Sequence, residues 1–121
     1  MEFIEKSSIV GLANPGVVSR QILNPGNSAS ERVTITEVHL EAGAEQPRHT
    51  HLASEQIWYA LQGAGTLLLA DGEEKAFAAG DAVRFADGDV HGLRNDGEKE
   101  FVYLSVTSPP IDFGYAYQER K

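Results

Sequence analysis

The sequence predicts an all-β domain of the sandwich or barrel type. Short segments rich in β-branched and aromatic residues alternate with Gly, Pro and Asp-Gly turn signals along most of the chain. No segment shows the long apolar repeat, with a period of about 3.6 residues, that an amphipathic helix requires. Many short strands at regular spacing are typical of antiparallel sandwiches and barrels. We expect a single domain that spans residues 1–121.

The first expected strands follow one another between recognisable turns. Two Asn-Pro-Gly turns, at 14–16 and 24–26, bracket a strand with the sequence VVSRQIL. The segments ERVTITEVHL (31–40) and QIWYALQG (56–63) are the next strands, and the loop that begins EAGAEQP follows the first of them. A hairpin comes next, in which we expect Asp71-Gly72 to form a two-residue turn.

The second half of the chain continues this pattern as far as a proline break. The segment DAVRFADGDVHGLRN is interrupted at Gly88, and we expect Asp96-Gly97 to form a hairpin into the strand KEFVYLSVT. The C-terminal tail, residues 108–121, begins with SPP and carries aromatic residues at every second position from Phe113 to Tyr117. Such a tail is expected to cover an edge of the barrel or a partner subunit.

Composition and charge exclude several classes of function. The chain has no cysteine, so a transition metal has to be held by nitrogen and oxygen atoms. The net charge of −8 opposes binding to a phosphate backbone, and we expect no nucleic-acid partner. No apolar run is long enough to span a bilayer, and the N-terminus lacks the features of a signal peptide. These features predict a cytoplasmic protein without a membrane partner.

Three histidines are the main candidates for chemistry. His49 and His51 lie two residues apart, so on a strand both imidazoles would project from the same face. His91 lies at the start of another expected strand, just beyond the sequence DGD. Three histidines from two strands that face one interior would supply three ligands of a mononuclear metal site. A lone histidine is more often structural, and His39, outside this pattern, either lines the cavity or faces solvent.

The spacing of these residues resembles two motifs of the cupin superfamily. The residues that match the first motif, G-x5-H-x-H-x3/4-E-x6-G, are Gly43, His49, His51 and Gly63, with Gln56 at the usual position of the glutamate. The residues that match the second motif, G-x5-P-x-G-x2-H-x3-N, are Gly80, Gly88, His91 and Asn95, with alanine in place of proline. The resemblance covers residues 43–95 and implies a double-stranded β-helix of the jelly-roll type. It also implies one divalent metal inside the barrel and a homodimer.

The fourth ligand is either Gln56 or Glu55. Counting six residues back from Gly63 leads to Gln56, whereas Glu55 fits the shorter spacing from His51. Alternation along a strand places Gln56 on the face of Trp58, and Glu55 on the more apolar face. Burial of the apolar face favours Glu55, but the motif spacing favours Gln56, which we select with Glu55 as the alternate. Trp58 is then either a wall of the substrate pocket or an ordinary core residue.

A glutamine ligand has a chemical consequence. An amide oxygen adds no negative charge, so a metal held by His49, His51, Gln56 and His91 would keep its full double charge and act as a stronger Lewis acid. A neutral ligand also cannot accept a proton from a substrate. We therefore expect metal-assisted isomerisation or enol–keto rearrangement of a sugar acid or keto acid. The residue types leave the metal open between Ni, Fe, Mn and Zn.

Two other functions remain as alternatives. One is an Fe(II)-dependent dioxygenase, because a set of neutral ligands can also hold iron. The other is a non-catalytic module that binds or senses a small ligand. Oxygen uptake with Fe(II) would indicate the first, and tight ligand binding without turnover would indicate the second.

The ligand set is also similar to that of small cupins of pectin degradation, which convert unsaturated uronates to keto sugars. In that group the segment after the last strand carries an acidic residue and a phenylalanine near the metal. The resemblance therefore makes Asp112 a candidate proton carrier, unless it is only a turn residue, and makes Phe113 a pocket residue. Ile111 stands where that group has an arginine. The remaining candidates for holding a substrate carboxylate are Arg48, Arg84 and Arg94.

Overall fold

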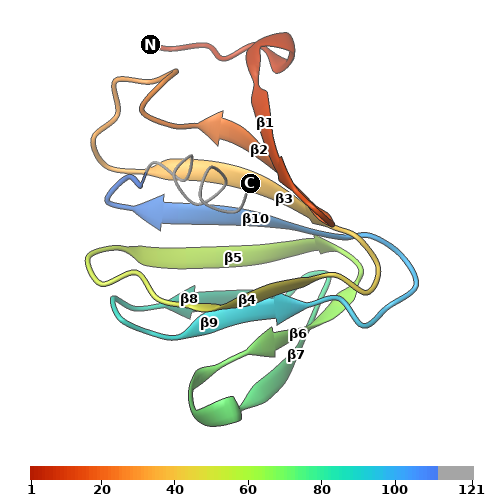
Figure 1. Cartoon of the computed structure of the whole chain (residues 1–121). Helices are drawn as coiled ribbons and strands as arrows, with labels where there is room; N and C mark the ends of the chain where they lie inside the picture. The colour runs from red at the N-terminus through yellow and green to blue at the C-terminus, as the bar shows by residue number, and fades with distance from the viewer. Residues whose placement is uncertain (112–121) are drawn as a thin grey trace.

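The computed structural model describes residues 1–111, within which two antiparallel sheets form (Figure 1). The strands of the six-stranded sheet are, in order, β1 (Val10–Asn14), β2 (Val17–Leu23), β3 (Thr34–Leu40), β10 (Phe101–Ser108), β5 (Glu55–Gln62) and β8 (Ala82–Phe85). The strands of the four-stranded sheet are β4 (Glu45–His49), β9 (His91–Arg94), β6 (Ala64–Leu68) and β7 (Glu74–Ala78). The short helices are η1 (Lys6–Ser8) and η2 (Ala70–Gly72). No helix in this part of the chain has the length and hydrophobicity needed to cross a membrane.

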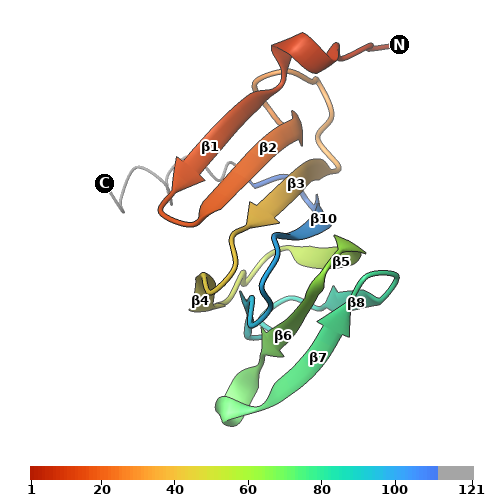
Figure 2. The ribbon, with the colours of Figure 1, turned by 90° about the vertical axis from the view of Figure 1, so that its right-hand side faces the viewer.

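After β3 the chain crosses repeatedly from one sheet to the other. Strands β3, β5, β8 and β10 belong to the six-stranded sheet, and β4, the β6–β7 hairpin and β9 alternate with them along the chain. The two sheets face each other (Figure 2). The hydrophobic core lies between them. This arrangement is the double-stranded β-helix, so the predicted fold is confirmed.

The turn signals near the N-terminus act as predicted. The strand VVSRQIL is β2, and its partner β1 precedes it with Asn14 opposite Val17. The two residues between them, Pro15 and Gly16, form the turn, and Gly16 has a φ of 80°, which favours glycine. The second Asn-Pro-Gly segment closes a turn after β2, where Asn24 Oδ1 accepts a hydrogen bond from the Gly26 N–H at 2.8 Å.

The prediction of a hairpin at Asp96-Gly97 is wrong. Strand β9 pairs with β4 and β6, whereas β10 pairs with β3 and β5, so this connection crosses between the sheets. An Asp-Gly pair reverses the backbone locally but does not determine which strands pair. Asn95 fixes the crossing, because its Nδ2 donates to the carbonyls of Leu40 at 3.0 Å and Lys99 at 2.8 Å.

The predicted hairpin at Asp71-Gly72 forms, but its turn is longer than expected. The ladder extends to a hydrogen bond of 2.8 Å from the Leu69 N–H to the Glu73 carbonyl. The loop beyond that bond contains the three residues of η2 rather than two. Asp71 and Gly72 both have positive φ values, 58° and 74°, so the reversal occurs where the sequence places it.

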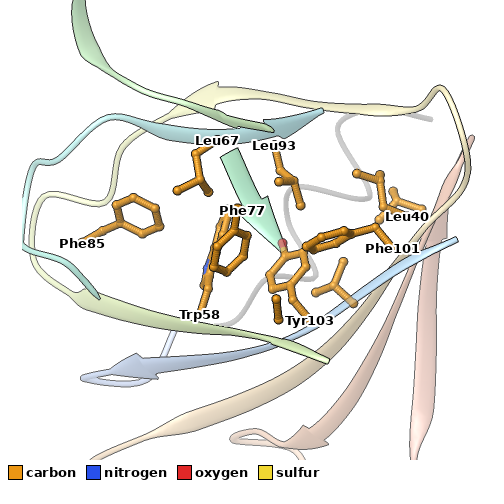
Figure 3. Close-up of a cluster of buried hydrophobic side chains, with 11 residues drawn as sticks. Leu40, Trp58, Leu67, Phe77, Phe85, Leu93, Phe101 and Tyr103 are labelled. Carbon is orange, nitrogen blue, oxygen red and sulfur yellow. The ribbon is translucent and has the colours of Figure 1, made fainter. Parts of the chain in front are cut away.

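Alternation along the strands fills the space between the sheets with apolar side chains (Figure 3). The cluster consists of Val17, Val38, Leu40, Trp58, Ala60, Leu67, Phe77, Phe85, Leu93, Phe101 and Tyr103. Burial of a large apolar side chain contributes about 1.5–3 kcal/mol to stability. Phe77 and Phe101 pack with ring centroids 5.8 Å apart, and Trp58 and Tyr103 with centroids 4.5 Å apart. The contact between Phe77 and Phe101 joins the two sheets, and the contact between Trp58 and Tyr103 packs neighbouring strands of the six-stranded sheet.

Candidate metal centre

Three histidines meet where β4 and β9 pair. His49 is the last residue of β4, His91 is the first residue of β9, and the two are register partners. His51 lies two residues beyond the end of β4. Each ring offers one nitrogen, and these three nitrogens all lie within 4.8 Å of one another. The cluster is therefore tight enough for the three rings to share one metal ion.

The route by which His51 reaches the cluster differs from the prediction. We expected His49 and His51 on one face of a strand, but β4 ends at His49 and His51 belongs to the following loop. A hydrogen bond of 2.9 Å from the Gly88 N–H to the His51 carbonyl ties this loop to the segment before β9. The centroid of the His51 ring lies 5.0 Å from that of His49 and 5.3 Å from that of His91.

Backbone carbonyls orient two of the three rings. Nδ1 of His49 lies 2.9 Å from the Pro47 carbonyl, and Nδ1 of His91 lies 2.9 Å from the Asp89 carbonyl. A carbonyl only accepts hydrogen bonds, so each Nδ1 carries the proton and each Nε2 keeps its lone pair. Nε2 of His91 is buried and has no hydrogen-bond partner. A metal-binding histidine commonly has this arrangement, with one nitrogen on a carbonyl and the other on the metal.

A bulge in β4 sets the position of His49. Gln46 pairs with Leu93 and His49 pairs with His91, so β4 has one more residue than β9 between these pairs. The bulged backbone presses on Gly92, where an added Cβ would lie 2.7 Å from the Gln46 carbonyl oxygen. Sequence reasoning missed the role of Gly92. The signal that was available is a glycine inside a strand, which often marks close approach of another backbone.

The structure places the two candidates for the fourth ligand on opposite faces of β5. Gln56 is buried on the inner face, and its Oε1 accepts a hydrogen bond of 3.0 Å from Trp58 Nε1–H. Glu55 faces outward and pairs with Arg84 at 3.3 Å. Gln56 is opposite Phe85, whose ring stacks on that of His91 with centroids 4.6 Å apart. Gln56 therefore lies on the face of β5 that carries the residues packed against His91, and Glu55 lies on the opposite face.

A family model described as a cupin domain matches residues 36–107 of the chain. This match includes all three clustered histidines and Gln56. The protein is a cupin.

Several known proteins are similar to this cupin at low sequence identity, two of them in a comparison of structures. KdgF from Halomonas sp. is 23% identical, with 93% of this chain and 96% of that chain covered and a TM-score of 0.78. Ectoine synthase from P. lautus is 18% identical, with 98% and 86% covered and a TM-score of 0.80. An uncharacterised protein of Methanocaldococcus jannaschii is 26% identical over 99 residues, which are 82% of this chain and 78% of that protein.

The electrostatics of the cluster favour the neutral form of His51 and His91. Burial lowers the pKa of His91 to about 4, and a positive charge on His49 would act in the same direction. Burial also lowers the pKa of His51, and the second cause is again the charge of His49. Both imidazoles are therefore unprotonated at pH 7, the form in which histidine binds a metal.

Trp58 of this cupin takes part in both the core and the wall of the cluster. Its side chain is buried among core residues, with its ring 5.0 Å from Phe85 and 4.5 Å from Tyr103. The same ring meets His91 edge-on at a centroid distance of 5.4 Å. Tyr103 in turn donates its hydroxyl to Gln46 Oε1 at 2.7 Å, which links the core to β4. Trp58 is therefore a core residue that also contacts the cluster, and its role as a wall of a substrate pocket stays a prediction.

The three arginines considered for a substrate carboxylate all lie on outer faces of the barrel. Arg84 pairs with Glu55 at 3.3 Å, and Arg94 pairs with Glu74 at 2.9 Å. Arg48 donates to the backbone carbonyls of the β6–β7 connection. Strand alternation explains this result, because a neighbour of each arginine points inward. Those neighbours are His49, Phe85 and Leu93.

The remaining candidates lie elsewhere or beyond the described part of the chain. His39 is not in the cluster, because its ring pairs with Glu37 at 2.7 Å and Glu100 at 3.0 Å on the outer face of the six-stranded sheet. Asp112 and Phe113 lie outside the described residues, so their roles stay predictions.

Proposed function

We propose that this cupin holds one divalent transition metal through His49, His51 and His91, with Gln56 as the fourth ligand. The observation that carries the proposal is the convergence of three imidazoles whose ligand nitrogens lie within 4.8 Å of one another. The His91 ring supports it further, because its Nδ1 is held by a carbonyl and its buried Nε2 has no hydrogen-bond partner. A buried polar atom without a partner is costly unless a ligand satisfies it.

We propose that the site catalyses isomerisation or enol–keto rearrangement of a small oxygenated substrate. A bound divalent metal would act as a Lewis acid that polarises a carbonyl or enol oxygen. The three histidines and Gln56 are neutral donors, so they would leave the full positive charge of the metal for this purpose. At least one similar structure carries the name of a synthase, which shows that the fold accommodates enzymes.

The charges around the cluster constrain how a sugar acid or keto acid would bind. Within residues 1–111, the arginines considered for this role are engaged on outer faces, as described above. A substrate carboxylate would therefore be neutralised at the metal position rather than by one of these guanidinium groups. The proton carrier of the reaction has to come from another group, and Asp112 remains the proposed candidate.

The metal proposal is tested by elemental analysis of purified protein. We expect close to one divalent metal per chain, and His91→Ala should lose most of it. His39→Ala is the matched control, because it also removes a histidine but lies outside the cluster. Equal metal content in His91→Ala and the wild type would contradict the proposed site.

The reaction is tested by deuterium exchange. The metal-loaded protein is incubated in D₂O with a panel of sugar acids and keto acids, and NMR follows the hydrogens next to the carbonyl carbon. We expect metal-dependent exchange or rearrangement of at least one compound and no oxygen consumption. Oxygen uptake that requires Fe(II) would instead identify a dioxygenase. Tight binding without exchange, uptake or turnover across the panel would identify a binding module.

A further inference from the structure

We infer that Trp58 and Thr107 are positioning residues for Gln56, which fix its carbonyl oxygen on the side of the histidines and its amide nitrogen on the opposite side. The inference rests on the metal centre proposed above, and it assigns a role to two residues that touch no ligand in that proposal. Thr107 was not a candidate from the sequence, because nothing in the segment VTS distinguishes it from other strand threonines.

Two hydrogen bonds hold the amide of Gln56. Its Nε2 donates to Thr107 Oγ1 at 3.0 Å, and its Oε1 accepts from Trp58 Nε1–H at 3.0 Å. An indole N–H only donates, so the atom facing Trp58 has to be the oxygen of the amide. Rotation of the amide by 180° would bring two buried donors together. The three side chains are only 4%, 2% and 0% exposed, so water cannot relieve such a contact.

The strand order determines which way each end of the amide points. Strand β5 lies between β10 and β8, with Gln56 opposite Thr107 on one side and Phe85 on the other. The amide nitrogen is therefore turned toward β10. Phe85 and Trp58 are the residues that pack against the His91 ring, at centroid distances of 4.6 Å and 5.4 Å. The carbonyl oxygen is held by Trp58, whose ring meets that of His91, and we assign this end of the amide to the histidine side.

The carbonyl oxygen retains the capacity to bind a metal in this orientation. A carbonyl oxygen has two lone pairs, and the indole hydrogen bond uses one of them. The indole N–H is a neutral donor, so this hydrogen bond adds no charge to the amide. Gln56 would therefore still bind the metal as a neutral ligand. Partners that orient a ligand in this way affect metal affinity by about 10- to 100-fold when they are removed.

The test uses Co(II) as the probe and measures both its dissociation constant and its visible absorption spectrum. Trp58→Phe removes the indole donor but keeps an aromatic ring, and Thr107→Val removes the hydroxyl but keeps the shape. We expect each to weaken Co(II) binding by about 10-fold or more and to shift the spectrum toward that of Gln56→Ala. Thr107→Ser should restore the affinity to within about twofold of the wild type, because it restores the acceptor.

Thr34→Val is the matched control for Thr107→Val. Thr34 is the cross-strand neighbour of Thr107, is equally buried, and its hydroxyl has no hydrogen-bond partner. The same change of side chain there should leave Co(II) affinity and spectrum unchanged. A weaker affinity in both variants would mean that the effect comes from general disturbance of the strand, and would overturn the inference.

A double-mutant cycle separates positioning from a structural effect. In the Gln56→Ala background, Trp58→Phe should not weaken Co(II) binding further, because its effect acts through Gln56. Additive losses would overturn the inference, even if Thr107→Val does not fold. Wild-type Co(II) binding with an unchanged spectrum in Trp58→Phe would also overturn it while leaving the three-histidine centre intact. Failure of the wild-type protein to bind Co(II) would contradict the metal proposal itself.

Discussion

The two halves of the inner face of the six-stranded sheet have the same backbone pattern and opposite chemistry. In one half, the inward residues other than Ser19 are Val17, Val38, Leu40, Ala60, Phe101 and Tyr103. In the other half, most inward residues are polar, and these are Gln21, Thr34, Thr36, Gln56, Ser105 and Thr107. The four-stranded sheet follows the same division, because Leu93 lies toward the apolar half and His91 lies beside Phe85 at the polar end.

This difference separates stability from function within one barrel. Buried apolar side chains provide most of the favourable free energy of folding. Buried hydroxyl and amide groups cost free energy unless each finds a hydrogen-bond partner. Threonine resembles valine in shape and keeps a high preference for strands, so it carries a polar group into the interior without disrupting the sheet. The polar half is therefore tolerated because the apolar half stabilises the fold.

Phe101→Ala should have the largest effect on stability. Phe101 is 0% exposed and packs on Phe77 and Tyr103, so the truncation leaves a cavity in the apolar half. We expect the free energy of unfolding to fall by about 3–5 kcal/mol in a urea titration. Metal content per folded chain should remain close to that of the wild type. Loss of metal at an intact fold would show that the two halves are not separable.

Gly92→Ala should affect both halves at once. An added Cβ would meet the β4 backbone at Gln46, Pro47 and Arg48, the last two at 3.0 Å, and would push the bulge away from β9. We expect a loss of about 1–3 kcal/mol in the free energy of unfolding, together with weaker metal binding, because His49 follows this bulge.

Gly11→Ala is the control for this change. A Cβ at Gly11 would meet its nearest atom, in Val18, at an ordinary 3.6 Å. The control should therefore lose little stability and no metal affinity. Unchanged metal affinity in Gly92→Ala would show that the bulge in β4 does not position His49 for metal binding.

The sequence predicts the histidine cluster because each of the two motifs is a local pattern and the family resemblance implies that they meet, but it does not predict how the chain supports the cluster. The alternation of β3 and β10 and the spacing from Gly43 to Gly63 are read directly from neighbouring residues. The bulge in β4 depends on Gly92, which is distant in sequence and adjacent only in the folded sheet. The crossing after β9 likewise depends on which strands are available to pair.

The choice between Gln56 and Glu55 shows the same limit of local reasoning. Apolar neighbours favoured an inward Glu55, but Tyr59 and Leu61, on its face, are 45% and 44% exposed. Arg84 on β8 supplies an outer partner for Glu55, and this pairing is known only once β5 and β8 are neighbours. The homodimer, the location in the cytoplasm and the roles of Asp112 and Phe113 stay predictions.

Thr34→Val should make the polar half more stable. The Thr34 hydroxyl is buried without a hydrogen-bond partner, so its replacement by a methyl group removes a cost and keeps the volume. We expect the free energy of unfolding to rise by about 1 kcal/mol in urea. Thr107→Val, at the adjacent position, should lower it instead, because Gln56 Nε2 would lose its acceptor. Equal effects at both positions would refute the assignment of partners.

Substitution of His39 should have the smallest effect on stability. This residue tests the outer face of the sheet, whereas the predictions above test the interior. Burial lowers the pKa of His39, but hydrogen bonds and charges of Glu100 and Glu37 outweigh it and raise the pKa above the usual 6.5. A raised pKa in the folded state means that protonation stabilises the fold. This contribution is present below about pH 6.5 and is lost as the pH rises through the folded-state value. His39→Gln should therefore cost about 0.5 kcal/mol at pH 6 and almost nothing at pH 9, measured by urea unfolding. The same cost at both pH values would show that His39 acts by packing alone, in which case its ion pairs contribute no measurable stability to the outer face.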